Sequence, residues 1–400
     1  GEANQVLACL RGDASSGYTI TVYGIGGVSA PADSMGLFYD HGNRWSRLTE
    51  IDLSNFDTSN TWNMQNFFMG CESLATLDLT KMDTSSAENM MNLLYGCSAL
   101  TSVDFSSFDT SKVLNMQGML RGCSSLTTID ATPLETDNVQ YMGSMFYDCS
   151  SLTSVDTTGW NTGSATSMSS MFRNTYAMTE VKGIETWDVS KVTTFNAMFY
   201  MEKNTSVFTG PLDLSSWNPA SAVNMGHMFR NLDKLTEINV SGWEMPELNT
   251  IDCFLYDCGA LTTLQMEGWD VPELESIYMM VASCINLLEV DLSTWTNVNS
   301  MKNLYSAFSN CKAVTSIKIP GWTVVAEADE MASDYDGYYV DLYCAFNQCT
   351  SLTDVDMSGW TVGGPGVGTN NDRYWDATGI FQNTGKLETL DVSGWTIAEG

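Results

Sequence analysis

Apolar and polar residues recur along the chain with a period of 26 residues. The segment Leu48–Phe56 is repeated at this interval, and its first leucine recurs as Leu74, Leu100, Leu126 and Leu152. Within each copy, stretches such as Leu77-Asp78-Leu79 alternate apolar and polar residues, which is typical of a strand with one buried face. A unit this short cannot bury its apolar face alone. The pattern therefore predicts a repeat solenoid in which the strands of successive units pair in parallel.

Three residue columns repeat in the same frame. The first is large and apolar, and tryptophan occupies it in nine of thirteen units: Phe56, Met82, Phe108, Leu134, Trp160, Trp187, Trp217, Trp243, Trp269, Trp295, Trp322, Trp360 and Trp395. The second is cysteine in most units: Cys71, Cys97, Cys123, Cys149, Cys258, Cys284, Cys311 and Cys349. The third is apolar and lies three residues before the second, with local slippage at Phe199: Phe68, Leu94, Leu120, Phe146, Phe172, Phe199, Phe229, Leu255, Val281, Phe308, Phe346 and Phe381.

The segment before each cysteine places apolar residues three and four positions apart, as in Asn89–Leu94, which favours a short helix or 3₁₀ turn opposite the strand. The predicted fold is therefore an α/β repeat solenoid, a right-handed leucine-rich-repeat-like superhelix with one short parallel strand and one short helix or 3₁₀ turn per 26-residue rung. About thirteen units fill residues 48–400. Residues 1–47, with a strand expected at Tyr18–Tyr23, form an N-terminal cap with short β-strands.

The charge balance narrows the range of partners. The chain has 48 acidic and 17 basic residues and a formal net charge of −31, and no stretch concentrates its lysines and arginines. Nucleic acid is therefore excluded as a partner. No apolar run is long enough to cross a bilayer, and no export signal is recognisable in this chain.

The repeat resembles a known family. Asn115–Leu126, the Ile129-Asp130 pair that follows, and Phe108–Val113 resemble the 26-residue unit of the BspA-like bacterial surface proteins, and the likeness extends over roughly residues 35 to 395. The resemblance implies a secreted or cell-surface bacterial protein, in some members lipid-anchored, that works in adhesion. It also implies no enzyme activity and no catalytic residues.

The cysteines are expected to be buried free thiols. Parallel side chains in one column meet the torsional requirement of a disulfide poorly, although neighbouring rungs bring them close together. Cys253 with Cys258 and Cys344 with Cys349 share a rung each, and a bridge within either pair is the alternative.

Two observations bear on catalysis. The only histidines, His41 and His227, belong to no catalytic motif. The polar strand position is aspartate in most units, from Asp52 and Asp78 to Asp391, which forms a row of carboxylates. This row would suit calcium, a cationic ligand or a polysaccharide-active enzyme of the β-helix type. The simpler interpretation is that each carboxylate accepts hydrogen bonds from nearby serine or threonine.

Two insertions interrupt consecutive rungs at the same place. Trp322 to Phe346 spans 24 residues and Trp360 to Phe381 spans 21, where Phe56 to Phe68 spans 12. We expect the insertions to lie side by side and to form an aromatic, acidic binding patch for a protein or glycan. The candidate binding residues are Asp334, Tyr335, Asp336, Tyr338, Tyr339, Asp372, Tyr374 and Trp375.

These observations predict a non-enzymatic cell-surface binding or adhesion protein that recognises a macromolecular partner, protein or glycan, through the solenoid face and the inserted loops. No cofactor is expected, with calcium as the one metal that the acidic loops would suit. A polysaccharide-active enzyme and a passive surface spacer are the alternatives. The short segment after Trp395 leaves the last rung uncapped, so end-to-end self-association is also expected.

Overall fold

The computed structural model describes residues 7–13, 17–23, 28–39, 46–202, 205–325, 327–328, 338–363 and 373–397. The chain divides into two compact units, Gly1–Asp188 and Val189–Gly400, called unit 1 and unit 2 below. The division falls where the cysteine column is interrupted by Thr175 and Ser206. The boundary between cap and repeats at residue 47 stays a prediction.

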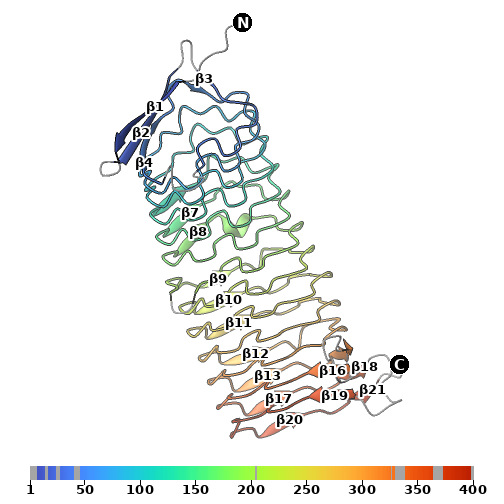
Figure 1. The fold of residues 1–400 in the computed structure, drawn as a ribbon. Helices are drawn as coiled ribbons and strands as arrows, with labels where there is room; N and C mark the ends of the chain where they lie inside the picture. Colours follow the sequence, from blue (N-terminus) through green and yellow to red (C-terminus); the bar gives the residue numbers. More distant parts are fainter. Residues whose placement is uncertain are drawn as a thin grey trace. The chain divides into compact units, whose positions relative to one another are not determined.

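Unit 1 begins with a small sheet and continues as stacked rungs (Figure 1). Strand β1 (Leu7–Asp13) pairs antiparallel with β2 (Gly17–Tyr23), which confirms the strand expected at Tyr18–Tyr23, and β2 pairs in parallel with β4 (Leu48–Asp52). A second pair of parallel strands is formed by β3 (Val28–Ser29) and β5 (Phe56–Asp57). Further rungs supply a parallel sheet of β6 (Thr128–Asp130), β7 (Ser154–Asp156) and β8 (Glu180–Lys182).

The register confirms the period. Ile129 lies opposite Val155, which lies opposite Val181, so paired residues are 26 positions apart. These middle residues are buried, and their neighbours on each strand are exposed or half-buried. In the rungs at residues 74–82 and 100–108 the equivalent segment forms no regular strand. The predicted repeat solenoid with parallel strands is confirmed, although not every rung carries a strand.

Unit 2 has the same organisation. One sheet contains β9 (Leu212–Asp213), β10 (Glu237–Asn239) and β11 (Thr263–Gln265). The next contains β12 (Glu289–Asp291), β13 (Ser316–Lys318), β17 (Asp354–Asp356) and β20 (Thr389–Asp391), all parallel. A separate parallel sheet follows the tryptophan column and contains β14 (Thr323–Val325), β18 (Thr361–Gly363) and β21 (Thr396–Ile397).

Where a short helix or 3₁₀ turn was expected in each rung, the described residues have turns and almost no helix. The described residues contain one 3₁₀ helix, η1 (Ile184–Thr186), and no α-helix. In place of a helix, each rung has consecutive turns over the segment equivalent to Met90–Cys97, which we call the turn wall. Leu93 and Cys97 donate backbone hydrogen bonds to the residues three positions before them. The third residues of these two turns, Asn92 and Gly96, have φ of 54° and 75°.

Hydrogen bonds between rungs explain why turns replace the helix. The N–H groups of Met90, Asn92 and Leu94 donate to carbonyl groups of the next rung, at 2.8–2.9 Å. An α-helix over so short a segment would leave its first four N–H groups without partners and would bond the rest within its own rung. The turn wall instead shares them between rungs, and it needs left-handed residues that asparagine and glycine adopt most readily.

The tryptophan column forms the centre of the core. Its rings stack on one another within each unit, with centroid separations such as 5.6 Å for Trp243–Trp269 and 4.9 Å for Trp269–Trp295. The Trp269 ring is fully buried, and its Nε1 donates to the carbonyl oxygen of Val240 at 2.7 Å. Trp269 thus fills the space between rungs and satisfies a backbone acceptor, as Trp243 and Trp295 also do.

Candidate binding surfaces

The two insertions meet in one small sheet of unit 2. Strand β15 (Glu327–Ala328) pairs with β16 (Tyr338–Asp341), and β16 pairs in parallel with β19 (Arg373–Asp376). We call these three strands the inserted sheet. Figure 1 shows β16 and β19 on the side of their rungs opposite β17 and β20. The expectation that the insertions lie side by side is confirmed.

The structure places half of the candidate residues on this sheet. The register sets Tyr339 opposite Tyr374, and Trp375 opposite Val340, while Tyr338 lies opposite Arg373. For these candidates the backbone positions alone are described. The remaining candidates lie outside the described residues: Asp334, Tyr335, Asp336 and Asp372. Their part in binding stays a prediction.

Two carboxylates meet where the inserted sheet joins the turn wall. Asp341 and Asp376 are register partners, and Asp341 is half-buried. Burial raises the pKa of Asp341, the backbone N–H of Tyr343 opposes this shift through a 2.9 Å hydrogen bond, and the charge of Asp376 adds to it. This edge of the sheet therefore holds its negative charge less readily than an exposed aspartate would.

A stack of tyrosines, which the sequence analysis missed, lies next to this edge. The rings of Tyr278, Tyr305 and Tyr343 are half-buried on three consecutive rungs. Their centroids are 5.1 Å and 5.0 Å apart and their planes differ by 23° and 19°. Each tyrosine lies three residues before the apolar column, a regularity that would have identified the stack from the sequence. Because the ring faces cover one another, the stack offers its edges to a partner.

A second column on the turn wall alternates tyrosine and arginine. In unit 1 the Arg121 guanidinium carbon lies 4.3 Å from the centroid of the Tyr147 ring and 5.2 Å from that of Tyr95. Arg173 lies 5.1 Å from the same Tyr147 ring. Unit 2 repeats the arrangement with Arg230 between Tyr200 and Tyr256, at 5.4 Å and 4.8 Å. These residues directly follow the apolar column and were also missed by the sequence analysis.

The aspartate row on the strand face has a structural use. In Asp104 and its equivalents, carboxylate Oδ1 accepts the backbone N–H of the residue two positions later, which closes the turn after the strand. The distance is 2.8 Å from Ser106 to Asp104 and 3.0 Å from Thr80 to Asp78. The Thr80 hydroxyl and backbone N–H lower the pKa of Asp78, and the Ser106 backbone N–H and hydroxyl lower that of Asp104. The interpretation that each carboxylate accepts hydrogen bonds from nearby serine or threonine is confirmed for Asp78 and Asp104.

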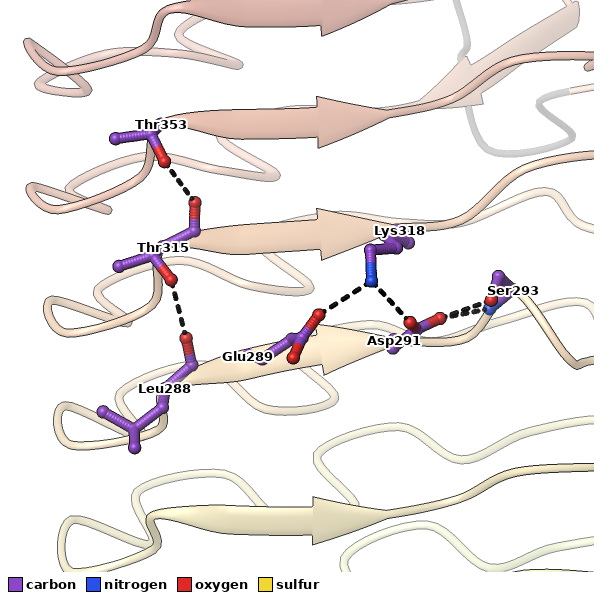
Figure 2. A network of polar contacts seen from close by, with 7 residues as sticks. All are labelled: Leu288, Glu289, Asp291, Ser293, Thr315, Lys318 and Thr353. Atoms are coloured by element: carbon purple, nitrogen blue, oxygen red, sulfur yellow. Dashed lines mark hydrogen bonds and ion pairs between the residues drawn. The ribbon is translucent and has the colours of Figure 1, made fainter.

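Lysine enters the row in two rungs and neutralises it locally. Figure 2 shows Lys318 Nζ donating to Glu289 at 2.8 Å and to Asp291 at 2.7 Å, while Ser293 also donates to Asp291. Burial alone would raise the pKa of Asp291, but the bonds from Lys318 and Ser293 outweigh it and lower that pKa. Exposed ion pairs of this kind contribute roughly 0–1 kcal/mol each.

The same face has a ladder of threonines. The Thr315 hydroxyl donates to the carbonyl oxygen of Leu288 at 3.3 Å, and the Thr353 hydroxyl donates to that of Thr315 at 3.0 Å (Figure 2). Together with the aspartate turns, these bonds join polar groups of the strand face to one another within and between rungs. We therefore assign this face a mainly structural role.

The cysteine column is buried and free, as expected. Every cysteine whose side chain the structure describes is unbridged, including the pairs Cys253–Cys258 and Cys344–Cys349. The thiol of Cys123 donates to the Leu94 carbonyl oxygen at 3.2 Å, and burial raises the pKa of its neighbour Cys149 to about 12. A thiol so hard to ionise is a poor nucleophile and a poor metal ligand.

The histidines and the clustering of possible ligands bear on catalysis and metal binding. His41 lies outside the described residues, and the ring nitrogen Nδ1 of His227 lies 3.2 Å from Arg230 Nη1 on the turn wall. Among the described residues, no group of three or more Asp, Glu, His or Cys could hold a metal ion. The described part of the chain also has no helix with the length and apolar character needed to span a membrane.

The last rung leaves its apolar residues exposed in this chain. Leu390 is 43% exposed and Trp395 is 37% exposed, whereas their equivalents one rung earlier, Val355 and Trp360, are 1% and 0% exposed. The end-to-end self-association expected from the sequence stays a prediction.

Comparison with protein families gives one match. The model described as "Mycoplasma protein of unknown function, DUF285" matches residues 37–154, 101–204, 149–266 and 233–338. These overlapping matches cover more than half of the 400-residue chain and lie within the repeats. None of the curated proteins compared with the chain is a significant match.

Several solved structures share a weak likeness. A leucine-rich cell surface protein from Faecalibacterium prausnitzii is 15% identical with a TM-score of 0.33, covering 89% of this chain and 95% of that one. The Drosophila Toll–Spatzle complex is 12% identical with a TM-score of 0.31, and the match covers 80% of this chain and 45% of that one. The ectodomain of the Arabidopsis thaliana receptor kinase GASSHO1/SCHENGEN3 is 11% identical with a TM-score of 0.21, and the match covers 79% of this chain and 45% of that one. TM-scores this low support no inference.

Proposed function

The chain belongs to the DUF285 family of mycoplasma proteins, and on this premise we propose that it is a non-enzymatic binding protein of the cell surface. The partner is a protein or glycan that contacts the inserted sheet of unit 2. The observation that carries the proposal is the pairing of β16 with β19, because it joins two insertions from separate rungs into one surface.

The surroundings of the inserted sheet support this choice of site. Tyr343 follows the last residue of β16 by two positions, so the tyrosine stack continues the surface that β16 begins. Aromatic residues dominate the energetic centres of protein interfaces, since they bury a large area with little loss of side-chain entropy. The sequence of the inserted strands adds Tyr338, Tyr339, Tyr374 and Trp375 to the same surface.

Two further parts of the proposal rest on the sequence. The resemblance to BspA-like proteins supports a role in adhesion at a bacterial surface, with a lipid anchor as one means of attachment. The structural use of the aspartate row argues against the polysaccharide-active enzyme, because such an enzyme works with a pair of carboxylates and carboxylates such as Asp104 close turns instead.

The test compares the full chain with two variants on an array of oligosaccharides and immobilised extracellular-matrix proteins, with and without calcium. In the first variant, short glycine-serine linkers replace residues 329–337 and 364–372. In the second, serine replaces Tyr338, Tyr339, Tyr374 and Trp375. Tyr141→Ser is the matched control, since Tyr141 is a 45% exposed tyrosine of unit 1.

We expect a partner that binds the full chain and the control but neither variant. Binding that survives both changes would move the site away from the inserted sheet. Binding to nothing in either calcium condition would favour the passive spacer. Loss of binding only when calcium is removed would assign the metal a part in the inserted loops.

A further inference from the structure

The guanidinium group of Arg121 contacts two aromatic rings and has no polar partner among the described residues. Its central carbon lies 5.2 Å from the centroid of the Tyr95 ring and 4.3 Å from that of Tyr147, one rung to either side. Its Nε is buried and forms no hydrogen bond. A guanidinium stays charged and offers five N–H donors in a planar fork. In a chain with 48 acidic residues, this fork nevertheless joins no carboxylate of the described residues.

Arg230 of unit 2 shows how such a fork is satisfied within the chain. It lies between the rings of Tyr200 and Tyr256, at 5.4 Å and 4.8 Å, in the manner of Arg121. Its Nη1 also lies 3.2 Å from Nδ1 of His227, which is three residues earlier in the chain. The edge of the Arg230 fork therefore has a partner in its own rung.

Gly118 leaves the edge of the Arg121 fork open. Gly118 and His227 occupy the same place in their rungs, each three residues before its arginine, and their φ values are 62° and 59°. A Cβ on Gly118 would lie 3.8 Å from the Cβ of Arg121, but glycine has no side chain that could reach the fork. The two arginines thus have similar ring contacts, and they differ at the edge.

The backbone beside the Arg121 fork is bare and already hydrogen-bonded. Gly96 and Gly122 directly follow Tyr95 and Arg121, and a Cβ on Gly122 would lie 4.0 Å from the Tyr95 ring. The N–H of Gly96 donates to the Arg121 carbonyl oxygen, and the N–H of Gly122 donates to that of Tyr147, both at 2.7 Å. These glycines therefore leave space for a bulky ring, but they offer no free N–H for pairing with a peptide strand.

We propose that the edge of the Arg121 fork binds the carboxylate of an acidic sugar. The two tyrosine rings hold the guanidinium in place, so little side-chain entropy is lost on binding. Two parallel N–H groups of the fork match the two oxygens of one carboxylate. The pyranose ring occupies the space beside Gly96 and Gly122. The half-buried Tyr95 and Tyr147 each carry a hydroxyl that can donate to and accept from sugar hydroxyls.

The charges around the site favour a ligand with a single negative charge. Asp148, the residue after Tyr147, adds a carboxylate to this part of the turn wall and accepts a hydrogen bond from Asn174 Nδ2 at 3.0 Å. A phosphate dianion would have one guanidinium to offset two negative charges, whereas a carboxylate brings one. More distant carboxylates are screened beyond about 8 Å at physiological salt. The site therefore suits a monocarboxylated sugar better than a sugar phosphate.

The test is a saturation-transfer NMR titration of the full chain at physiological salt. The carboxylated probes are sialyllactose and methyl glucuronide, which distinguish two sources of the same carboxylate chemistry. Lactose and methyl glucoside are their neutral counterparts. A hexose phosphate tests the charge of the ligand, and N-acetylglycylglycine tests a peptide carboxylate.

The variants separate the fork from its surroundings. Arg121→Met removes the fork, and Arg121→Lys keeps the charge without the fork geometry. Gly118→His introduces into unit 1 the side chain that lies against Arg230 in unit 2. Gly118→Ala is its matched control, because Ala197 occupies the equivalent place with a φ of 56°. Arg230→Met is the control for loss of a ring-stacked arginine elsewhere, and thermal unfolding verifies that each variant is folded.

We expect at least one carboxylated sugar to bind at least about tenfold more tightly than its neutral counterpart, the hexose phosphate and the peptide. Arg121→Met and Gly118→His should weaken this binding at least about tenfold, and Arg121→Lys should retain it only in part. Gly118→Ala and Arg230→Met should leave it unchanged.

Three results would overturn the proposal. They are the failure of both carboxylated sugars to bind, equal binding of a neutral sugar, the phosphate or the peptide, and a loss with Arg230→Met as large as that with Arg121→Met. If Gly118→His does not fold, the Arg121 variants still decide the outcome. None of these variants alters the inserted sheet, so the two proposals fail separately.

Discussion

At the scale of single residues, core side chains double as hydrogen-bond partners for backbone groups. The Cys123 thiol and the Trp269 indole both donate to carbonyl groups of the preceding rung. Trp322 occupies the same column, but its buried Nε1 has no acceptor among the described residues. The Trp322 indole therefore contributes packing alone.

This difference predicts unequal effects of the same substitution. Trp269→Phe should lower the free energy of unfolding by about 1–2 kcal/mol more than Trp322→Phe, because only the first leaves a buried carbonyl group without its donor. Both indoles are fully buried, so the loss of ring area is matched. Urea denaturation of the two variants measures the difference. Equal losses would mean that the indole hydrogen bond is unimportant.

The aspartate turns predict instability in acid. The hydrogen bonds from Ser54, Thr80 and Ser106 lower the pKa of Asp52, Asp78 and Asp104 in the folded chain. A lowered folded pKa contributes stability above the unfolded value of about 3.9, and this contribution is lost as the pH falls below it. Urea midpoints measured from pH 6 to pH 2.5 should therefore fall most steeply below about pH 4.

Asparagine variants provide the control for this prediction. Replacing all three aspartates with asparagine keeps an oxygen acceptor in each turn and removes the titration. The variant's urea midpoint should fall less steeply in acid than that of the parent chain. An unchanged slope would assign the acid sensitivity to other carboxylates.

At the scale of elements, strands were predictable and the turn wall was not. Alternation of apolar and polar residues, as in Thr128–Asp130, indicates a single structure, a strand buried on one face. The spacing of apolar residues in Asn89–Leu94 is ambiguous, because a helix and consecutive turns both bury residues three and four positions apart. The distinguishing signal was Asn92 and Gly96, four residues apart, since both suit a left-handed backbone.

Among the candidate binding surfaces, the pairing of the insertions was predictable from the sequence and the tyrosine and arginine columns were not. The pairing of the insertions followed from their position in consecutive rungs, because residues at one place in a repeat must stack. The tyrosine and arginine columns required attention to half-exposed positions such as Tyr305 and Arg121, which apolar periodicity does not mark. Their ring contacts depend on side-chain conformations that the pattern of the sequence leaves open.

Two glycines of unit 2 test whether the turns require a left-handed backbone conformation. Gly242 has a φ of 75° and Gly259 has no positive φ, while neither has an atom within 4 Å of the position that a Cβ would take. Gly242→Ala should lower the free energy of unfolding by about 1–2 kcal/mol. Gly259→Ala should leave it unchanged or raise it by about 0.4–1 kcal/mol.

Denaturant unfolding of the two glycine variants provides the measurement. A similar loss in both would mean that steric crowding, and not backbone conformation, restricts these positions. No loss in either would contradict the left-handed conformation at Gly242.

At the scale of the whole molecule, charge is the dominant property. The formal net charge is −31, and the repeat places like charges at the same position of neighbouring rungs, as with Asp78 and Asp104. Self-repulsion of this kind destabilises the folded chain and is weakened by salt. The few lysines of the strand face, such as Lys318, relieve it only where they occur.

Raising sodium chloride from 20 mM to 500 mM should therefore increase the melting temperature by a few degrees. Sodium chloride screens charge without strongly enhancing apolar burial, and a matched concentration of sucrose serves as the uncharged control. A melting temperature that falls with salt would show that local ion pairs outweigh the net repulsion.

In the column of arginines and tyrosines, the rungs of the solenoid fix the distances between side chains. The distance between two guanidinium groups is set by the number of rungs between them, so it changes only in whole steps of ~4.8 Å. Deleting one 26-residue unit between Arg121 and Arg173 would shorten the spacing by one step without altering either side chain. Gain or loss of whole repeats would therefore change the distance between these side chains in whole steps, while the contacts within each rung stay the same.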